Sequence, residues 1–415
     1  MNDSEFASLA VEIKHQIEPV IKRIEENVLR NQAKVLAAFQ EAKVSDYHFS
    51  SSTGYGYNDR GREIIEQVYA TTFRAEAALV RPHIVSGTHA ICLGLFGVLR
   101  PEDELLYITG APYDTLEEVI GVRGNAGDGS LRDFGVTFHS VPLRNNKIDW
   151  DEIRRRIHSK TKMVGIQRSS GYAWRPSFTV AEIRQMVRFV KEIKPDVIVM
   201  VDNCYGEFTE TEEPTEAGAD LVVGSLIKNP GGGLAPTGGY LVGRSEIIHR
   251  AACRLTAPGI GAEQGAMLGT NRGILQGFFL APHVVGEALK GAVYASAMFE
   301  RVGLETSPRW EESRTDIIQA VRLGSKERLI AFCQAIQSAA PVDSHVKPEP
   351  WDMPGYEDPV IMAAGAFVQG ASIELSADGP IRDPYIGFMQ GGITYEHVQL
   401  AILSALETMK ERKLL

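Results

Sequence analysis

Two reactive side chains, an aspartate and a lysine, each follow a short apolar segment of the sequence. Asp202 closes the run Val197-Ile-Val-Met-Val201, and Lys228 comes shortly after Leu221-Val-Val-Gly-Ser225, just before a glycine-rich turn. Apolar runs of this length are typical of central strands in a parallel sheet, and ligands bind beyond the carboxyl ends of such strands. We therefore expect both side chains to point into one site.

This pair of residues has the chemistry that pyridoxal phosphate requires. A lysine amine can form a Schiff base with the aldehyde, and burial is expected to lower the pKa of Lys228 and free its amine for attack. The carboxylate of Asp202 can keep the pyridine nitrogen protonated, so that the ring withdraws electrons. Each residue alone is explained as well by a surface position at a strand exit, and it is the combination that favours a cofactor site.

A phosphate group has a candidate binding turn earlier in the chain. Ser86, Gly87 and Thr88 follow a predicted strand, Arg81–Val85, and precede an apolar helix that begins near His89. Free backbone N–H groups and the helix dipole at such a helix start favour an anion. An ordinary Ser/Thr N-cap is the more common explanation for this tripeptide taken alone.

The composition restricts the class of protein and of partner. The chain has 415 residues, of which 44% are hydrophobic and 40 are glycines, which is enough for a large core and a smaller second domain. The net charge of −10 and the lack of a basic run disfavour nucleic acid and anionic membranes, so we expect small-molecule ligands. The four cysteines lack zinc-ligand spacing, and no apolar stretch reaches transmembrane length. We expect a cytoplasmic protein with reduced thiols and no metal site.

Strand-like and helix-like segments alternate along the middle of the chain, which predicts an α/β fold with a mostly parallel, doubly wound sheet. We expect an N-terminal helical arm (1–50), a large cofactor-binding α/β domain (51–281) and a smaller C-terminal α+β domain (282–415). No nucleotide P-loop and no G-x-G-x-x-G after a first strand is present, which disfavours NTP and dinucleotide binding. The predicted strands are Glu104–Thr109, Val136–Leu143, Lys162–Gln167, Asp196–Val201, Asp220–Val223 and Tyr240–Val242.

The two ends of the chain carry further predicted elements. Apolar residues recur every three or four positions from Phe6 to Val28, which indicates a long amphipathic helix with a break at Pro19. Packing on its own subunit and packing across a dimer are equally compatible with this pattern. Near the other end we predict a strand at Ala371–Leu375 and a loop at Gly379–Tyr385.

The segment from Ser50 to Arg62 concentrates small residues, two tyrosines and two arginines, which is typical of a binding loop. Tyr57 and Arg60 are its candidate ligands, because an arginine fork and a phenol can supply the charge and directed hydrogen bonds that a phosphate needs. A polar linker with arginines facing water is the alternative interpretation.

Together these segments resemble the fold-type I pyridoxal-phosphate enzymes of cysteine and methionine metabolism, particularly the methionine γ-lyase-like branch that includes aluminium-resistance proteins. The resemblance covers most of the chain from about Ser50 onward, and its motifs are specific only in combination. They are Ser86-Gly-Thr-His-Ala90, Thr109-Gly-Ala-Pro-Tyr-Asp-Thr115, Gln167-Arg-Ser, Val201-Asp-Asn203, Gly224-Ser-Leu-Ile-Lys-Asn229 and Gln369-Gly-Ala-Ser-Ile-Glu-Leu-Ser376 through Gly379-Pro-Ile-Arg382.

The resemblance implies a role for each matching residue around the cofactor. Lys228 is similar to the Schiff-base lysine and Asp202 to the partner of the pyridine nitrogen, with Gly87, Thr88 and Ser225 as phosphate ligands. Tyr113 is similar to the aromatic residue that stacks on the cofactor ring, where its hydroxyl can also assist proton transfer. His89 is a rival for the stacking role.

The resemblance also implies a homodimer or homotetramer with a shared active site. The loop containing Tyr57 and Arg60 resembles one that relatives extend across their dimer interface to the phosphate of the neighbouring chain. The chain departs from the better-known cystathionine enzymes at Ile227, where they usually carry a threonine directly before the lysine. One phosphate hydroxyl of those enzymes is therefore missing at this position and must be supplied elsewhere.

The reaction implied is cleavage of a carbon–sulfur bond in a sulfur-containing amino acid, of the methionine γ-lyase or cystathionine β-lyase type. The substrate carboxylate needs a planar bidentate donor, for which Arg382 is the first candidate and Arg168 the second. Transamination, aldol cleavage and a non-catalytic binding or regulatory role stay open, because this fold hosts many chemistries. The sequence does not distinguish β- from γ-elimination.

Overall fold

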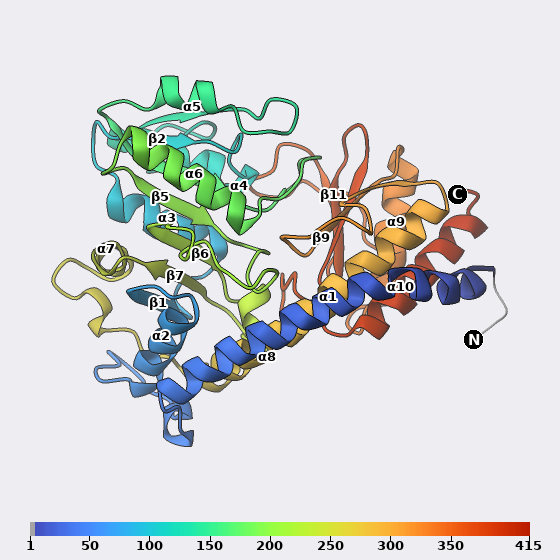
Figure 1. The fold of residues 1–415 in the computed structure, drawn as a ribbon, viewed down its shortest axis with the longest axis horizontal. Helices are drawn as coiled ribbons and strands as arrows, with labels where there is room; N and C mark the ends of the chain where they lie inside the picture. Colours follow the sequence, from blue (N-terminus) through green and yellow to red (C-terminus); the bar gives the residue numbers. More distant parts are fainter. Residues whose placement is uncertain (1–4) are drawn as a thin grey trace.

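The computed structural model describes residues 5–415, so the first four residues of the predicted N-terminal arm lie outside the described residues. Two lobes, each built on its own sheet, are joined by long helices (Figure 1). The helices are α1 (Glu5–Glu41), α2 (Arg60–Thr72), α3 (Gly87–Val98), α4 (Asp114–Ile120), α5 (Trp150–Arg156), α6 (Val180–Ile193), α7 (Ser245–Leu255), α8 (Asn271–Arg301), α9 (Lys326–Ser338) and α10 (Tyr395–Glu411). Short 3-10 helices are η1 (Asp46–Phe49), η2 (Arg132–Phe134), η3 (Asn229–Gly231) and η4 (Gly261–Glu263).

The larger sheet has seven strands in the order β1-β7-β6-β5-β4-β2-β3. All strands run in one direction except β7, which is antiparallel to both of its neighbours. The predicted mostly parallel α/β sheet is thus confirmed. Its strands are β1 (Ala77–Arg81), β2 (Glu104–Tyr107), β3 (Thr137–Ser140), β4 (Thr161–Gln167), β5 (Ile198–Asp202), β6 (Leu221–Ser225) and β7 (Gly239–Gly243).

Helices cover both faces of this sheet, as a doubly wound fold requires. Alternate residues of a strand point to opposite faces, so Val223 packs in a cluster with α3 and α7, whereas Val222 joins the cluster that contains α2, α6 and α8. Strands buried on both faces need apolar residues at every position, which explains the continuous Val, Ile and Leu runs in β5 and β6.

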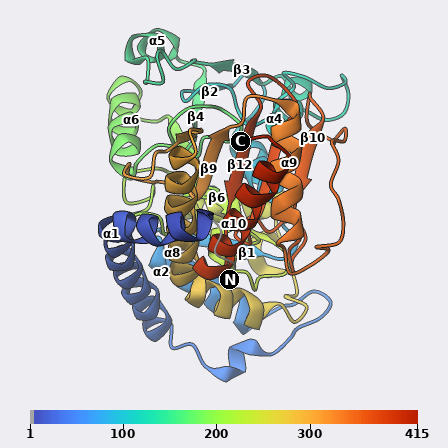
Figure 2. The ribbon, with the colours of Figure 1, turned by 90° about the vertical axis from the view of Figure 1, so that its right-hand side faces the viewer.

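The smaller lobe contains an antiparallel sheet in the order β10-β11-β12-β9-β8. Helix α9 contacts β10, β11 and β12, and α10 packs against α8 and α9. Figure 2 shows α9 and α10 side by side in front of this sheet. The strands are β8 (Glu305–Ser307), β9 (Ile318–Arg322), β10 (Val360–Ala363), β11 (Ser376–Pro380) and β12 (Ile386–Gln390).

The N-terminal helix packs on its own chain, where α1 runs alongside α8 from one lobe to the other (Figure 1). Its apolar stripe, including Ile13, Ile17 and Ile24, is buried. The predicted break at Pro19 is wrong, because α1 is continuous through that residue. Its proline lacks only one backbone donor, and the buried stripe on either side holds the helix together.

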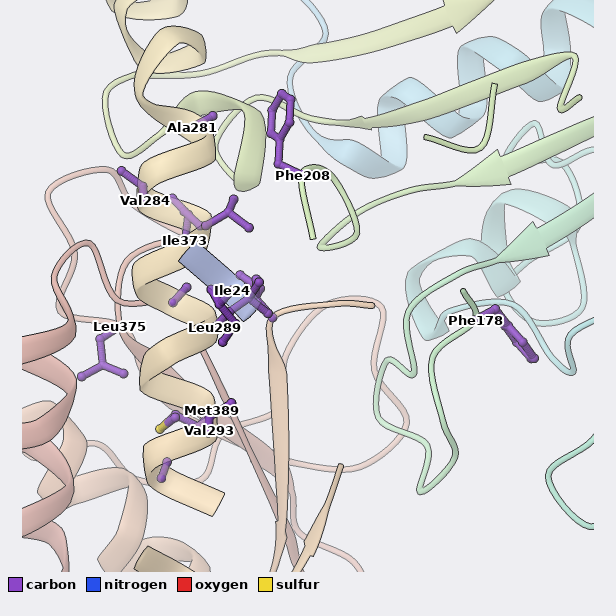
Figure 3. Close-up of a cluster of buried hydrophobic side chains, with 14 of the residues drawn as sticks. Ile24, Phe178, Phe208, Ala281, Val284, Leu289, Val293, Ile373, Leu375 and Met389 are labelled. Atoms are coloured by element: carbon purple, nitrogen blue, oxygen red, sulfur yellow. The ribbon is translucent and has the colours of Figure 1, made fainter. Parts of the chain in front are cut away.

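Helix α8 is the centre of the hydrophobic core that both lobes share. Figure 3 shows Ala281, Val284, Leu289 and Val293 along this helix. Side chains from distant segments gather around it, among them Ile24 of α1, Phe208 of the large lobe and Ile373, Leu375 and Met389 of the C-terminal lobe. The boundary predicted between 281 and 282 lies inside α8, so this one helix serves both domains.

The C-terminal strand prediction is wrong in position. Residues 372–375 form a turn and a bend, and β11 begins at Ser376 and runs to Pro380. The predicted loop at Gly379–Tyr385 therefore starts inside a strand. The apolar residues Ile373 and Leu375 are buried against α8 and are not paired in a sheet. Their alternation with polar residues, which suggested a strand, therefore reflects packing on a helix.

Candidate active site

A cavity of about 300 Å³ lies at the carboxyl ends of β4, β5 and β6, between the two lobes. The large lobe contributes Gln167, Asp202 and Ser225 from these strand ends, together with Lys228. Residues Gln167 and Asp202 are direct neighbours in the sheet register. The opposite wall comes from the C-terminal lobe and includes Ser372, Ser376, Asp378 and Gln390.

Lys228 lines this cavity, as predicted, and its Nζ lies 4.0 Å from the centroid of the Tyr205 ring. It directly precedes η3, in which close packing requires glycine. A Cβ atom at Gly231 would collide with the Leu226 carbonyl oxygen, and Gly232 has a positive φ of 52°. The glycine-rich turn thus lets the chain reverse tightly behind the lysine.

The predicted lowering of the Lys228 pKa is wrong for the free amine. Burial by itself lowers the pKa of this ammonium, but four acidic side chains around it outweigh burial and raise the pKa above its usual value. They are Cys204, Tyr205, Asp202 and Glu207. The sequence pattern indicated a buried lysine but not how many acidic groups would surround it.

Asp202 is the last residue of β5 and is buried at the floor of the same cavity. Its Oδ1 accepts a hydrogen bond of 3.1 Å from the backbone N–H of Cys204. Burial raises the pKa of Asp202, and the positive charge of Lys228 opposes the rise. A protonated ring nitrogen beside this carboxylate would stabilise its ionised form further.

The start of α3 meets the end of β6 at one corner of the cavity. The position of Gly87 is so close to β6 that an added Cβ would lie 3.5 Å from the Ser225 Cβ atom. The Ser225 Oγ is shielded from solvent, and within residues 5–415 it has no hydrogen-bond partner. A buried hydroxyl without a partner, beside the N-terminus of a helix of 12 residues, fits a phosphate oxygen.

The neighbouring residues of α3 divide between capping and lining the cavity. Ser86 is the N-cap, and its Oγ accepts a 3.1 Å hydrogen bond from the His89 N–H. The Thr88 hydroxyl lies 3.0 Å from that of Thr115, and both residues line the cavity. His89 does not line it, because its Nδ1 accepts a hydrogen bond from the Val85 N–H and turns the ring away. The structure therefore does not place His89 for stacking.

Tyr113 does line the cavity and belongs to an aromatic cluster with Tyr172 and Tyr356. Its hydroxyl lies 2.8 Å from the Tyr356 hydroxyl. Burial raises the pKa of Tyr113 well above its usual value, so the phenol is protonated at neutral pH. A neutral phenol can donate a hydrogen bond or a proton, and its ring can pack against a flat cofactor.

The loop with Tyr57 and Arg60 faces solvent within a single chain. The Tyr57 hydroxyl accepts a 2.6 Å hydrogen bond from Gln264, and the Arg60 guanidinium lies 5.7 Å from the centroid of the Tyr47 ring. Neither side chain lines the cavity of its own chain. The loop is nevertheless ordered, because Arg62 is buried and donates to the carbonyl oxygens of Gly56, Glu263 and Gly265.

The structure does not place Arg168, the second candidate for the substrate carboxylate, in a position to bind it. Its side chain is fully buried, and each of its N–H groups has an acceptor within the protein. No donor is left for a ligand, so Arg168 holds the large lobe together instead. Its acceptors belong to Phe178, Asn203, Gly206, Thr209 and Glu210.

Arg382, the first candidate, lies in an adjoining pocket that shares Tyr113, Gln167 and Tyr172 with the main cavity. Its side chain is 43% exposed and pairs with Asp358 at 3.0 Å. An exposed ion pair of this kind is weak, so the guanidinium can exchange its partner for a substrate carboxylate. The structure thus brings Arg382 to the edge of the site rather than to its centre.

Sequence reasoning missed several residues of the cavity, chiefly Tyr356, Asp378 and Gln390. Asp378 stands between Ser376 and Gly379, two residues of the motifs already quoted, and an acid inside a strand of small residues was a usable signal. Tyr356 and Gln390 carry no such signal, because only folding of the C-terminal lobe brings them to the cavity.

Within residues 5–415 no helix is long and apolar enough to cross a membrane.

Comparison with known proteins gives a consistent picture. The sequence profile of the family described as methionine gamma-lyase matches residues 6–410. The uncharacterized protein YnbB of Bacillus subtilis is 57% identical over 407 residues, which are 98% of this chain and 97% of that protein.

Solved structures show the same similarity. A Listeria monocytogenes protein, provisionally described as a cystathionine beta-lyase involved in aluminum resistance, is 57% identical, with a TM-score of 0.95 over 97% of this chain and 99% of that chain. A carbon-sulfur lyase involved in aluminum resistance from Clostridium novyi NT is 48% identical, with a TM-score of 0.95 over 99% and 96% of the two chains. The fold alone is shared with the pyridoxal-5'-phosphate dependent protein YhfS of Escherichia coli, at 16% identity and a TM-score of 0.61 over 93% and 97%.

Proposed function

We propose that this chain, which belongs to the methionine gamma-lyase family, is a pyridoxal-phosphate-dependent carbon–sulfur lyase that acts on a sulfur-containing amino acid. One observation carries the proposal: Lys228, Asp202 and the partnerless Ser225 hydroxyl line a single cavity at adjacent strand ends. An amine, a carboxylate and an anion-binding corner are the three groups that hold this cofactor. The comparisons support a carbon–sulfur lyase in general and leave the substrate to experiment.

Each part of the cavity has a task in this reaction. Lys228 would hold the aldehyde covalently, and Ser225, Gly87 and Thr88 would hold the phosphate. When bound, the cofactor supplies a ring that takes up negative charge from the substrate α-carbon. The carboxylate of Asp202 would keep the ring nitrogen protonated and so maintain this electron demand.

Two side chains of the cavity are suited to accept or donate a proton during the reaction. The Lys228 amine, when it is not bonded to the cofactor, would serve as the base that takes the substrate α-proton. The acidic groups around Lys228 favour its protonated form, so it can retain the α-proton after accepting it. Tyr113 is protonated and lines the same cavity, where it could donate a proton to the departing sulfur.

We also infer that the active site is shared between the subunits of a homodimer, which can pair again into a tetramer. Of the residues that the structure describes, Lys228 is the one cation that lines the cavity, and its nitrogen would be bonded to the cofactor aldehyde rather than paired with the phosphate. The phosphate dianion then lacks a cationic partner from its own chain. Exposed Tyr57 and Arg60, on an ordered loop that faces outward, are suited to supply it to a neighbour.

Two measurements test the proposed function. The purified protein should show the visible absorbance of a pyridoxal Schiff base, and borohydride reduction followed by peptide mapping should find the pyridoxyl group on Lys228. Incubation with cystathionine, methionine and cysteine should then release a thiol and a 2-oxo acid, with alanine and threonine as controls that lack sulfur. Transfer of the amino group to an added 2-oxo acid without thiol release would identify an aminotransferase, and an adduct on another lysine would refute the site.

A further inference from the structure

The hydroxyl groups of two tyrosines, one from each lobe, meet in the active-site cavity. Tyr113 directly precedes α4 in the large lobe, and Tyr356 lies on the segment 351–359 that leads into β10 of the C-terminal lobe. Their oxygens are 2.8 Å apart, which is a typical length for an O–H···O hydrogen bond. Within residues 5–415 this is the one hydrogen bond of the Tyr113 hydroxyl.

An arginine holds together the two segments that carry these tyrosines. The Arg123 guanidinium donates hydrogen bonds to the carbonyl oxygens of Asp114, at 3.0 Å, and Gly355, at 2.6 Å. These two residues are direct chain neighbours of the two tyrosines. The Glu117 carboxylate fixes the arginine by accepting a 2.8 Å hydrogen bond from its Nε. The backbone on both sides therefore supports the contact between the phenols.

The surroundings leave the two phenols as partners of each other. The ring of Tyr172 packs against both, with centroid distances of 5.8 Å, but its hydroxyl donates a hydrogen bond to the Asp378 carboxylate. The further titratable groups that face the pair are Asp378 and Tyr205, together with Lys228 on the side of Tyr356. The hydrogen bond from one phenol to the other is thus the contact that orients the Tyr113 hydroxyl.

The electrostatics of the pair differ between its two members. Burial raises the pKa of both phenols, and it raises that of Tyr113 well above its usual value. Their hydrogen bond raises the pKa of Tyr113 further and opposes the rise in the pKa of Tyr356. A negative charge on the pair is therefore more stable on Tyr356 than on Tyr113.

We propose that Tyr356 is a positioning residue that orients Tyr113 as the acid of the reaction and replaces the proton that Tyr113 loses. When Tyr113 donates its hydroxyl proton to the departing sulfur, the Tyr356 proton moves to the Tyr113 oxygen. The sulfur leaves as a neutral thiol, and the half-buried Tyr356 phenolate recovers a proton from water. This inference rests on the proposed function, in which Tyr113 donates to the sulfur.

The first test uses two leaving groups of different basicity. S-ethyl-L-cysteine releases a strongly basic thiolate that needs an acid, whereas S-phenyl-L-cysteine releases a weakly basic thiolate that leaves without one. The homocysteine homologues form the same pair for γ-elimination. We expect Tyr356→Phe to lower kcat/KM about 10- to 100-fold for the ethyl compound and less than about threefold for the phenyl compound. The matched control is Tyr395→Phe on α10, outside the cavity lining, which should change neither value.

The second test asks whether the two phenols act together. Tyr113→Phe should lower kcat/KM for the ethyl compound at least as much as Tyr356→Phe does. Adding Tyr356→Phe to Tyr113→Phe should then cause a further loss of less than about twofold. Losses that multiply in the double variant would show that Tyr356 acts independently of Tyr113, and would overturn the inference.

The third test needs no turnover. A fluorinated tyrosine at position 113 is more acidic than tyrosine, and its fluorine NMR signal follows its ionisation in the cofactor-loaded enzyme. Once ionised, this ring accepts a hydrogen bond from the Tyr356 hydroxyl. Tyr356→Phe removes the donor and should lower the acid dissociation constant of the fluorinated ring about tenfold. Tyr395→Phe should leave it unchanged.

A further variant decides the question if Tyr356→Phe does not fold. Arg123→Gln leaves both phenols in place but removes the hydrogen bonds to Asp114 and Gly355. It should lower kcat/KM for the ethyl compound at least about threefold more than for the phenyl compound. Equal effects on the two compounds would contradict the proposed role.

The outcomes separate this inference from the proposed function. An equal loss of both compounds in Tyr356→Phe would show a structural role, and no loss of either would show no role, so each would overturn the inference. An unchanged acid dissociation constant of the fluorinated ring would overturn it as well. These results with thiol release by the unmodified enzyme would leave the lyase intact. A lack of thiol release from every compound would refute the lyase, and the titration would still decide whether Tyr356 positions Tyr113.

Discussion

The Lys228 ammonium lies over the face of Tyr205, 4.0 Å from the ring centroid, at the carboxyl ends of β5 and β6. Tyr205 follows Asp202 by three residues and has a left-handed backbone with φ of 74°, which turns its ring back over the strand ends. Its hydroxyl lies 3.1 Å from that of Ser372 in the C-terminal lobe. The position of the amine thus depends on correct docking of both lobes.

Asp202→Asn should retain the cofactor but lose most of its activity. The amide keeps the shape of the carboxylate and can accept the Cys204 N–H, but it cannot stabilise a protonated ring nitrogen. We expect turnover to fall by about 100-fold or more while the visible absorbance band persists. Steady-state assays and spectra of the same preparation measure both quantities. Turnover equal to that of the unmodified enzyme would show that Asp202 is not the ring partner.

The two candidate arginines should behave in opposite ways. Arg168→Lys cannot replace five buried hydrogen bonds with three donors, so it should lower the free energy of unfolding by about 3 kcal/mol. Arg382→Met removes an exposed group and should leave the melting temperature within about 2 °C while raising KM about tenfold. Thermal melts and assays on both variants decide. An unchanged KM in Arg382→Met would exclude Arg382 as the carboxylate ligand.

Activity should be restored when two inactive chains are mixed, if Tyr57 and Arg60 serve the neighbouring subunit. Lys228→Ala lacks the Schiff-base lysine and Arg60→Ala lacks the proposed phosphate ligand, so each homo-oligomer should be nearly inactive. In a mixed dimer, one of the two sites receives Lys228 from one chain and Arg60 from the other. Co-refolding and assay should recover up to about a quarter of full activity, since half of the dimers are mixed and each has one intact site. Demonstrated mixed dimers without activity would place the loop in its own subunit or outside the site.

Glu207→Gln should stabilise the protein more as the pH rises. Glu207 is buried, its Oε1 accepts a 2.7 Å hydrogen bond from Tyr240, and its Oε2 has no partner in the described chain. Burial raises its pKa to about 8, so the folded state binds the proton more tightly than the unfolded state, and stability falls between about pH 4.5 and pH 8. Glutamine cannot ionise and escapes this loss, which amounts to about 1 to 4 kcal/mol.

Melting temperatures of Glu207→Gln and the unmodified chain, measured from pH 5 to pH 8.5, test that expectation. The matched control is Glu212→Gln, because Glu212 is 51% exposed and should show a small, pH-independent offset. A constant difference between Glu207→Gln and the unmodified chain across this range would mean that Glu207 is already ionised at pH 5.

The sequence by itself determined the strand ends and the residues they carry. Apolar runs that are buried on both faces are recognisable without tertiary information, so the ends of β4, β5 and β6 were predicted to within two residues. Parallel strands share one carboxyl edge, which was sufficient to predict that Asp202 and Lys228 meet, whereas Ser225 was expected there from the family resemblance. The helix predicted to begin near His89 starts at Gly87, and it was recognisable because its Ser86 cap is a local signal.

Only the tertiary structure decided which candidate arginine can bind a ligand, that His89 faces away from the cavity, and that Asp378 lines its C-terminal wall. Both Arg168 and Arg382 were candidates from the sequence. All N–H groups of Arg168 donate hydrogen bonds to acceptors 10 to 42 positions away in the chain, and only folding brings these acceptors near. His89 has its ring turned by the Val85 backbone. Asp378 reaches the cavity because the C-terminal sheet docks on the strand ends of the large lobe. This docking depends on the shapes of two folded surfaces, which cannot be predicted from a local sequence pattern.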